Sequence, residues 1–302
     1  MISFRYHLVS IVAVFLALAL GVLMGTTVVN QGVIDDLNRR TEAAAKRADT
    51  LKGQLDDLET QLGRWDRFGD LVQPALLAGQ LAGRSVTLVT LERVDVAEID
   101  GVRSALEESG ASVTAVVVIK PRMALTDEAS QAELATLLGT EVSDSTTLSA
   151  AAARALGSRL SEGSVLGAED ILQLLVSQGF VAVLAGSISS AGGTDQAMVM
   201  LAGGGGDPVV APESFLMPLA GSLVEAGRPV AAVETVDSQY EFVSLIRVDR
   251  SVDGRLVTVD NADQLTGRIA LVLGLRDLFL SPGSGGDYGV KDGASGGLIP
   301  KP

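Results

Sequence analysis

The sequence contains no cysteine and only one histidine, His7, close to its beginning. Without cysteine the chain can form no disulfide, zinc knuckle or iron–sulfur cluster, and it has no thiol nucleophile. A single histidine near the start excludes a Ser-His-Asp triad and every metal site that needs two imidazoles. These two absences remove many of the common enzyme classes before any motif is considered.

Positive charge is also scarce, because 23 Lys and Arg stand against 37 Asp and Glu, for a net charge of −14. An acidic chain repels phosphate backbones, so no nucleic-acid partner is expected. Hydrophobic residues make up 47% of the 302 residues, which is enough for a sizeable core and excludes a disordered chain. The length indicates one large domain or two smaller ones.

One long apolar run lies near the N-terminus, with no charge between residues 8 and 29. As a helix it would rise about 33 Å, which is enough to cross a bilayer core of about 30 Å. The alternative is a cleaved signal peptide, with residues 17–19 imitating a small-residue cleavage site. Apolar sequence continues past that point, which favours a retained transmembrane anchor over residues 1–30. Gly21 and Gly25 form a GxxxG pair at which two such helices can approach closely.

The charges that flank this run do not decide its orientation. Arg5 precedes it, whereas Arg39, Arg40, Lys46 and Arg47 follow it. A plain count of Lys and Arg would leave the long C-terminal part inside the cell. Long domains, however, are translocated largely regardless of charge.

A heptad pattern follows the span and predicts a coiled-coil stalk over residues 31–78. Its a and d positions, called the seam below, alternate in spacing between three and four. The seam consists of Ile34, Leu37, Thr41, Ala44, Ala48, Leu51, Leu55, Leu58, Leu62, Trp65, Gly69 and Val72. A coiled coil implies a homo-oligomer or a partner membrane protein, and the flanking charges specify neither, since Arg47 would face Lys52. The alternative is a single amphipathic helix packed on its own domain.

The remaining sequence predicts an α/β class domain over residues 79–280, with a parallel sheet between two helical layers. Short apolar runs alternate with helical patterns, as expected for strands that are buried on both faces. Strands are predicted at 85–91, 112–119, 180–185, 197–202, 229–234 and 255–259, and helices at 96–109, 128–138, 147–160, 168–178, 213–226 and 265–280. Residues 281–302 are rich in glycine and proline and are expected to form a flexible tail.

Ligands of an open parallel sheet bind beyond the carboxyl ends of its strands. The loops there would supply Glu92, Arg93, Lys120, Arg122 and the segments 187–193, 203–207 and 234–237. The glycine run 203–206 could present amides to an anion, but it matches no phosphate-loop motif and is better interpreted as a flexible connection. Asp263 is expected to cap the last helix and not to bind a metal. No carboxylate pair is isolated as acid–base catalysis requires, so no enzyme is predicted.

Thioether sulfur is the one soft metal ligand that remains beyond the span. Met198 and Met200 would share one face of a strand, which makes them weak candidates for a Cu(I) site. Core packing accounts for them better, because neither a cysteine nor a second histidine can join them. No cofactor is evident.

Several segments together resemble one protein family: MISFRYHLVSIVAVFLALALGVLMG at the start, then GRSVTLVTL, GRPVAAVET, VTVDNADQLTGRIALVLGL and a terminal DYG followed by LIP. The chain is similar to actinobacterial copper transport proteins of the mycobacterial outer-membrane-protein-B type. The resemblance implies copper as the transported ion and a single-pass protein of the cell membrane with its C-terminal domain outside the cytoplasm; the family is also assigned to the outer membrane.

Two functions follow from this resemblance. The first is copper transport or homeostasis in the envelope, although one span and buried strands cannot form a pore alone. Members also resemble a corynebacterial envelope protein that works with a membrane partner. The alternative is therefore a bitopic scaffold whose coiled coil and α/β domain bind such a partner to regulate cell-wall hydrolysis and division.

Overall fold

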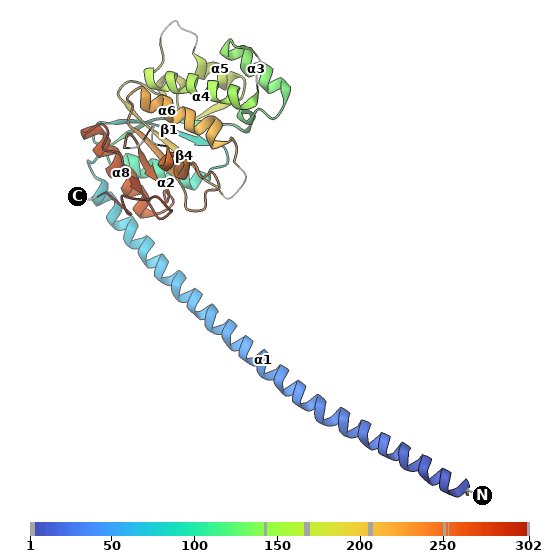
Figure 1. Cartoon of the computed structure of the whole chain (residues 1–302). Coiled ribbons are helices and arrows are strands. Elements are labelled where there is room, and N and C mark those ends of the chain that lie inside the picture. The colour runs from blue at the N-terminus through green and yellow to red at the C-terminus, as the bar shows by residue number, and fades with distance from the viewer. Residues whose placement is uncertain are drawn as a thin grey trace. The chain divides into compact units, whose positions relative to one another are not determined.

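The computed structural model describes residues 4–141, 144–165, 170–204, 208–249, 252 and 254–300, without the side chains of 26–33, 66 and 70. It divides into two compact units, Met1–Arg67 and Phe68–Pro302. The first unit is formed by helix α1 (Phe4–Leu77), which continues into the second and is drawn in blue in Figure 1. The predicted pattern weakens at Pro74, but the helix continues through this proline and ends three residues later.

The second unit, called the head below, contains a seven-stranded sheet in the order β3-β2-β1-β4-β5-β6-β7. The strands are β1 (Ser85–Leu91), β2 (Ser112–Ile119), β3 (Val181–Gly186), β4 (Gln196–Ala202), β5 (Val230–Glu234), β6 (Val257–Val259) and β7 (Asp287–Tyr288). Six of them match the predicted strands. All neighbouring pairs are parallel except β2 and β3, which are antiparallel.

The antiparallel edge corrects the expectation of a wholly parallel sheet. The backbone N–H of Lys120, just after β2, donates to the carbonyl of Phe180, just before β3. The chain therefore enters β3 at the edge where it left β2, and it must run in the opposite direction. The helical connection from β2 to β3 thus begins and ends at the same edge of the sheet, and for this reason β3 runs antiparallel to β2.

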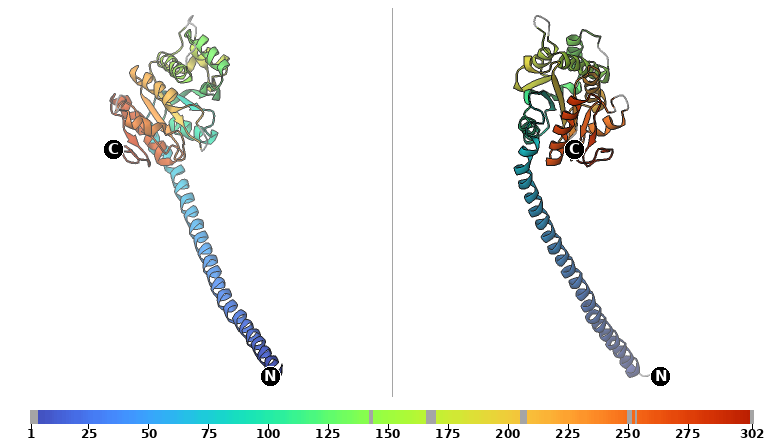
Figure 2. Two further views of the ribbon diagram at one scale, coloured as in Figure 1. Left: turned by 45° about the vertical axis from the view of Figure 1, so that its right-hand side comes forward. Right: turned by 90° about the vertical axis from the view of Figure 1, so that its left-hand side faces the viewer.

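The helices of the head are α2 (Val96–Glu108), α3 (Glu128–Leu138), α4 (Ser145–Glu162), α5 (Ile171–Ser177), α6 (Met217–Glu225), α7 (Phe242–Val248) and α8 (Leu265–Leu280). In Figure 1, α2 and α8 lie on one face of the sheet and α4 and α6 on the other, and Figure 2 shows these layers from two more sides. The predicted three-layer α/β architecture is confirmed. Helix α7 was not predicted.

Local sequence explains most of these elements. Every residue of β4 and β5 is buried, in keeping with continuous apolar runs covered on both faces. Three helices begin at an aspartate whose side chain accepts a first-turn N–H: Asp127, Asp144 and Asp170. Helix α3 ends at Gly139, which adopts the left-handed conformation that favours glycine.

The end of α1 belongs to the head. Leu77 is fully buried, and Gln73 Nε2 donates to Glu108 Oε2 at 2.8 Å. Arg268 Nε in turn donates to Gln73 Oε1 at 3.0 Å. Gln73 thus joins the last turns of α1 to α2 and α8. The head therefore begins near Phe68 and not at the predicted boundary of 79.

The C-terminal segment contains a strand that the expected flexible tail did not include. Residues of β7 pair with β6, and Tyr288 is buried. Gly289 has a φ of 134°, and a Cβ there would lie 2.0 Å from Asp260 Oδ1, so only glycine fits. The first part of the segment 281–302 is therefore a component of the sheet.

Candidate functional site

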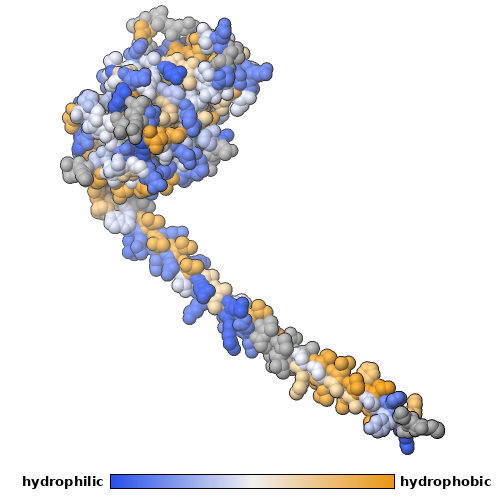
Figure 3. Space-filling model, in the orientation of Figure 1, coloured by the Kyte–Doolittle hydropathy of each residue, from blue (hydrophilic) through white to orange (hydrophobic). Residues whose placement is uncertain are grey.

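The seam leaves large apolar side chains exposed along the first unit. Leu55 is 59% exposed, Leu58 54% and Trp65 68%, and Ala44 and Ala48 are exposed as well. The side chains of Ile34, Leu37, Leu51 and Leu62 are exposed too. Figure 3 shows orange hydrophobic residues between blue hydrophilic ones along the helix that precedes the head. A helix with such a stripe has a surface ready for a partner helix, so pairing through the seam remains a prediction.

The N-terminal part of the same helix has the properties of a membrane span. Residues Phe4–Gly25 have a mean hydropathy of 2.7, and none of the segment is buried inside the protein. Apart from the adjacent backbone of the helix, no atom that the structure describes lies within 4 Å of a Cβ built at Gly21 or Gly25, so the GxxxG face is open for contact. The length and composition support a membrane anchor.

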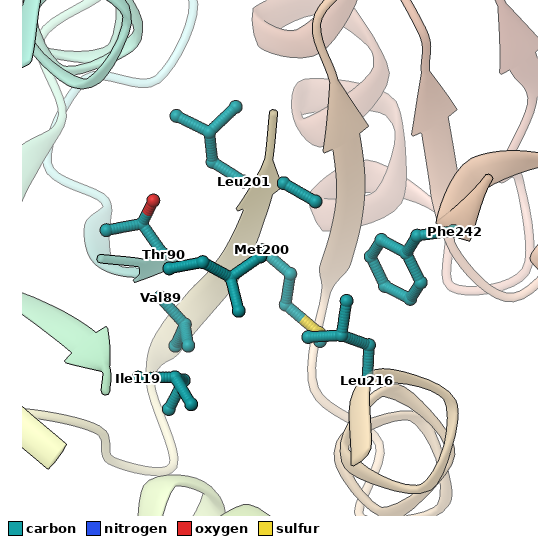
Figure 4. A pocket seen from close by; sticks show the side chains of 9 residues that line it. Val89, Thr90, Ile119, Met200, Leu201, Leu216 and Phe242 are labelled. Carbon is teal, nitrogen blue, oxygen red and sulfur yellow. The ribbon is translucent and has the colours of Figure 1, made fainter. Parts of the chain in front are cut away.

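Met198 and Met200 lie in the central strand β4 and are fully buried. In Figure 4 the Met200 side chain points between Leu216 and Phe242, and the space that these residues line holds no water-sized volume. The head residues that the structure describes contain no group of three His, Cys, Asp or Glu positioned for a metal. The geometry favours core packing for both methionines, and it offers copper no open access to their sulfur atoms.

The carboxyl ends of β1 and β4 mark the point where the chain reverses its direction of progress through the sheet. Here Glu98 of α2 approaches Gly203, and a Cβ on that glycine would lie 3.2 Å from Glu98 Oε2. Burial raises the pKa of the Glu98 carboxyl, and the negative charges of Asp237, Asp95 and Asp263 raise it further. This edge of the sheet is therefore acidic, but the described residues contain no group of carboxylates that converge as metal ligands do.

A second cluster of charges is buried beyond β5 and β6. Arg247 Nη1 donates to Asp260 Oδ2 at 2.6 Å, and Arg247 Nη2 donates to the Tyr288 carbonyl at 2.8 Å. Lys291 Nζ donates to Glu234 Oε2 at 3.3 Å. Burial raises the pKa of the Glu234 carboxyl, an effect that Lys291 opposes. These contacts fasten the C-terminal segment to the sheet and leave no open site.

The other predicted site residues are dispersed. Lys120 forms an ion pair with Glu92, and Arg122 pairs with Glu133 while its guanidinium lies 4.7 Å from the centre of the Phe180 ring. Of the glycine run, residues 205–207 lie outside the described residues. The structure does not bring the predicted loop residues together into one catalytic centre.

Asp263 was expected to cap α8, and this prediction is wrong. The helix begins after Gln264, and Asp263 Oδ1 accepts the backbone N–H of Val236 at 2.9 Å. The buried Arg247–Asp260 pair was missed entirely. In the sequence, each of the two is only a charged residue within or next to an apolar stretch. That they pair with each other becomes apparent only when α7 and β6 are placed.

Comparison with known proteins gives one consistent result. A family model described as "Copper transport outer membrane protein, MctB" matches residues 1–299. Proteins named copper transporter MctB from Mycobacterium tuberculosis and Mycobacterium bovis are 28% identical over 97% of this chain and 98% of their own length. A protein of the same name from Mycobacterium leprae is 26% identical over the full length of both chains.

Proposed function

The chain belongs to the MctB family of copper transport outer membrane proteins, and from that membership we propose that it is a membrane-anchored component of copper homeostasis in the cell envelope. Copper is the cargo in this proposal and not a resident cofactor. The family description names transport and no reaction, so no catalytic residue is assigned.

The mechanism is supported by the different positions of the apolar residues in the N-terminal helix and in the head. Within the described residues one helix is long and apolar enough to span a membrane, while the strands of the head are covered by helices. A path for ions across a bilayer needs several helices or a closed barrel. We therefore propose that one chain does not form a pore, and that copies or partners assemble through the seam and the Gly21–Gly25 face.

This proposal places copper handling in the assembly and not in a fixed site of the head. Both candidate methionines are buried, and Cu(I) prefers several converging soft ligands. The head then acts by binding other parts of the assembly on the same side of the membrane.

We further propose that the anchor is retained and that the head lies outside the cytoplasm. Protease added to spheroplasts should digest a C-terminal tag while a cytoplasmic control protein survives. A protected tag would show the opposite topology, and a mature chain that begins near Leu20 would show that the anchor is cleaved.

The function is tested by copper tolerance of a deletion strain. The strain should be sensitive to copper, and the wild type should restore growth, as should Met198→Leu with Met200→Leu. Leu55→Asp with Leu58→Asp should fail to restore it despite normal abundance in the membrane. Ala43→Asp with Thr60→Asp, which adds the same charge away from the seam, is the matched control and should restore tolerance. A deletion strain with unchanged copper tolerance would refute the proposal.

A further inference from the structure

The seam between residues 34 and 62 is an apolar surface that no other described residue covers. Its large side chains are each between 52% and 62% exposed, and they are Ile34, Leu37, Leu51, Leu55, Leu58 and Leu62. A helix over these residues rises about 42 Å, at 1.5 Å per residue. An apolar stripe of this length in water requires a second helix that covers it with a matching stripe.

A second copy of this chain meets the geometric requirements of such a helix. Under the proposed function, on which this inference rests, the span Phe4–Gly25 stays in the membrane, and it belongs to the same helix α1 as the seam. Every copy in that membrane therefore begins its seam at the same height and runs in the same direction. A two-fold axis along the pair then places each seam residue beside its own counterpart, so that apolar side chains meet apolar side chains.

The seam has two halves of different bulk. Thr41, Ala44 and Ala48 form thin layers in the half nearer to the span, whereas leucine occupies every a and d position from Leu51 to Leu62. In a parallel pair the leucine half supplies most of the apolar burial, because the gain scales with the area removed from water. The thin half contributes less, so the charges beside it have more influence on the pairing.

Two cations flank the thin half. Arg47 occupies a g position and Lys52 the following e position, and both are exposed. Arg40, one heptad earlier, pairs with Asp36 of its own helix at 2.8 Å, whereas no described residue forms an ion pair with Arg47 or Lys52. In a parallel pair each g residue faces the following e residue of the other helix. Arg47 therefore meets Lys52 of the second copy, and the two-fold axis repeats this contact.

From these features we propose that the seam binds a second copy of the chain, parallel and in register, and that the contact between Arg47 and Lys52 weakens this pairing at low ionic strength. The like charges are exposed, so water and salt screen them and the leucine layers outweigh them. Added salt therefore tightens the pair. An antiparallel copy would give a different pattern, because with Leu55 packed on Leu58 of the other copy, Lys52 would face Glu59.

The charges are tested by sedimentation equilibrium of the full chain in detergent, at about 20 mM and about 500 mM sodium chloride. The wild-type dimer should tighten with salt. Arg47→Glu should tighten it about fivefold or more at low salt, because both repulsive contacts become attractive, and salt should then tighten it less. Arg47→Glu with Lys52→Glu restores like charges and should return the affinity to near that of the wild type. Lys46→Glu, at the outward f position, is the control for net charge and should pair as the wild type does.

Cross-linking tests direction and register, because the chain has no cysteine of its own. Leu37→Cys and Leu62→Cys each place one thiol near an end of the seam, and diamide should convert both variants to disulfide-linked dimers in isolated membranes. An antiparallel pair would hold the two copies of either residue far apart. Ala43→Cys, at an exposed c position, is the control and should remain largely monomeric.

The proposal is overturned if neither thiol in the seam cross-links more than the control, if Arg47→Glu associates no more tightly than Lys46→Glu, or if Lys52→Glu alone weakens the pair, as the antiparallel contact requires. These results are independent of the copper test. A chain that pairs with itself while its deletion strain keeps normal copper tolerance would refute the proposed function and leave this interface. Copper sensitivity without self-pairing would leave the function and refute the interface.

Discussion

Leucine has opposite environments in the two units of this molecule. Leu88 in β1 is fully buried, whereas Leu55 of the seam is 59% exposed. The head buries its central strands between two helical layers, although some of its apolar side chains, such as Leu184 and Leu280, are exposed. The first unit presents an ordered apolar stripe that nothing within that unit covers. The comparison contrasts a head whose central strands are buried with a helix α1 whose apolar stripe is exposed, so pairing through α1 is the prediction to test.

The largest effect is expected where the seam is broken. Burying one leucine is worth about 1.5–3 kcal/mol, so Leu55→Asp with Leu58→Asp should abolish association. Sedimentation equilibrium of the full chain in detergent should show an oligomer for the wild type and a monomer for the variant. Ala43→Asp with Thr60→Asp should remain associated. Identical sedimentation of all three proteins would mean that the seam has no partner of its own kind.

The next largest effect should be a loss of stability when a buried ion pair inside the head is broken. Arg247→Met leaves the buried carboxylate of Asp260 without its cation, and loss of one partner of a buried pair costs about 3–5 kcal/mol. Urea unfolding of the full chain should detect this loss. Arg276→Met is the control, because its pair with Asp277 is partly exposed and contributes about 1 kcal/mol or less. Equal losses in both variants would show that burial of the Arg247 pair adds nothing.

The two core methionines should tolerate replacement. Met198→Leu with Met200→Leu conserves volume, and each change should cost less than about 1.5 kcal/mol. Competition with a chromogenic Cu(I) chelator should show the same weak copper binding for wild type and variant. If only the wild type strips copper stoichiometrically from the chelator, these residues form a site and the core-packing interpretation is wrong.

The smallest effect is expected at Glu98, and it depends on pH. The pKa of Glu98 is raised above its ordinary value of 4.5, so the folded state holds this proton more tightly than the unfolded state. The stability linked to that proton is present below the ordinary pKa and is lost as the pH rises through the folded pKa. Glu98→Gln should therefore match the wild type near pH 4 and exceed it slightly near pH 7 in urea unfolding. Glu107→Gln, on the exposed part of the same helix, should show no such gain.

Sequence patterns predicted the elements that local composition controls. The apolar block of α8 was predicted at its observed boundaries, and the β-branched runs of β1 and β2 were as clear. Helix α7 was missed because its start depends on a distant residue. The Phe242 N–H donates to Glu234 Oε1 at the end of β5, a contact that no local signal reveals.

The candidate sites were harder to predict than the fold. The seam and the two methionines are periodic features, so spacing alone located them. The buried Arg247–Asp260 pair joins α7 to the residue after β6, and these two segments meet only after folding, so it could not be inferred from neighbours in sequence. Asp263 illustrates the opposite case. An aspartate just before a helix is a typical N-cap residue, but its side chain accepts the backbone N–H of Val236 instead.

The position of β7 also determines which part of the head is completed last during synthesis. Asp260 accepts backbone N–H groups from Val290 and Lys291, so the edge of the sheet closes only when these residues are present. In a chain made from its N-terminus, β6 lacks its neighbour β7, and Asp260 lacks the N–H groups of Val290 and Lys291, until residues 287–291 have been made. Helix α1 is therefore made first, and this edge of the head is completed last. Truncations that remove residues 287–302 should therefore leave a head that an added protease digests faster than it digests the head of the full chain.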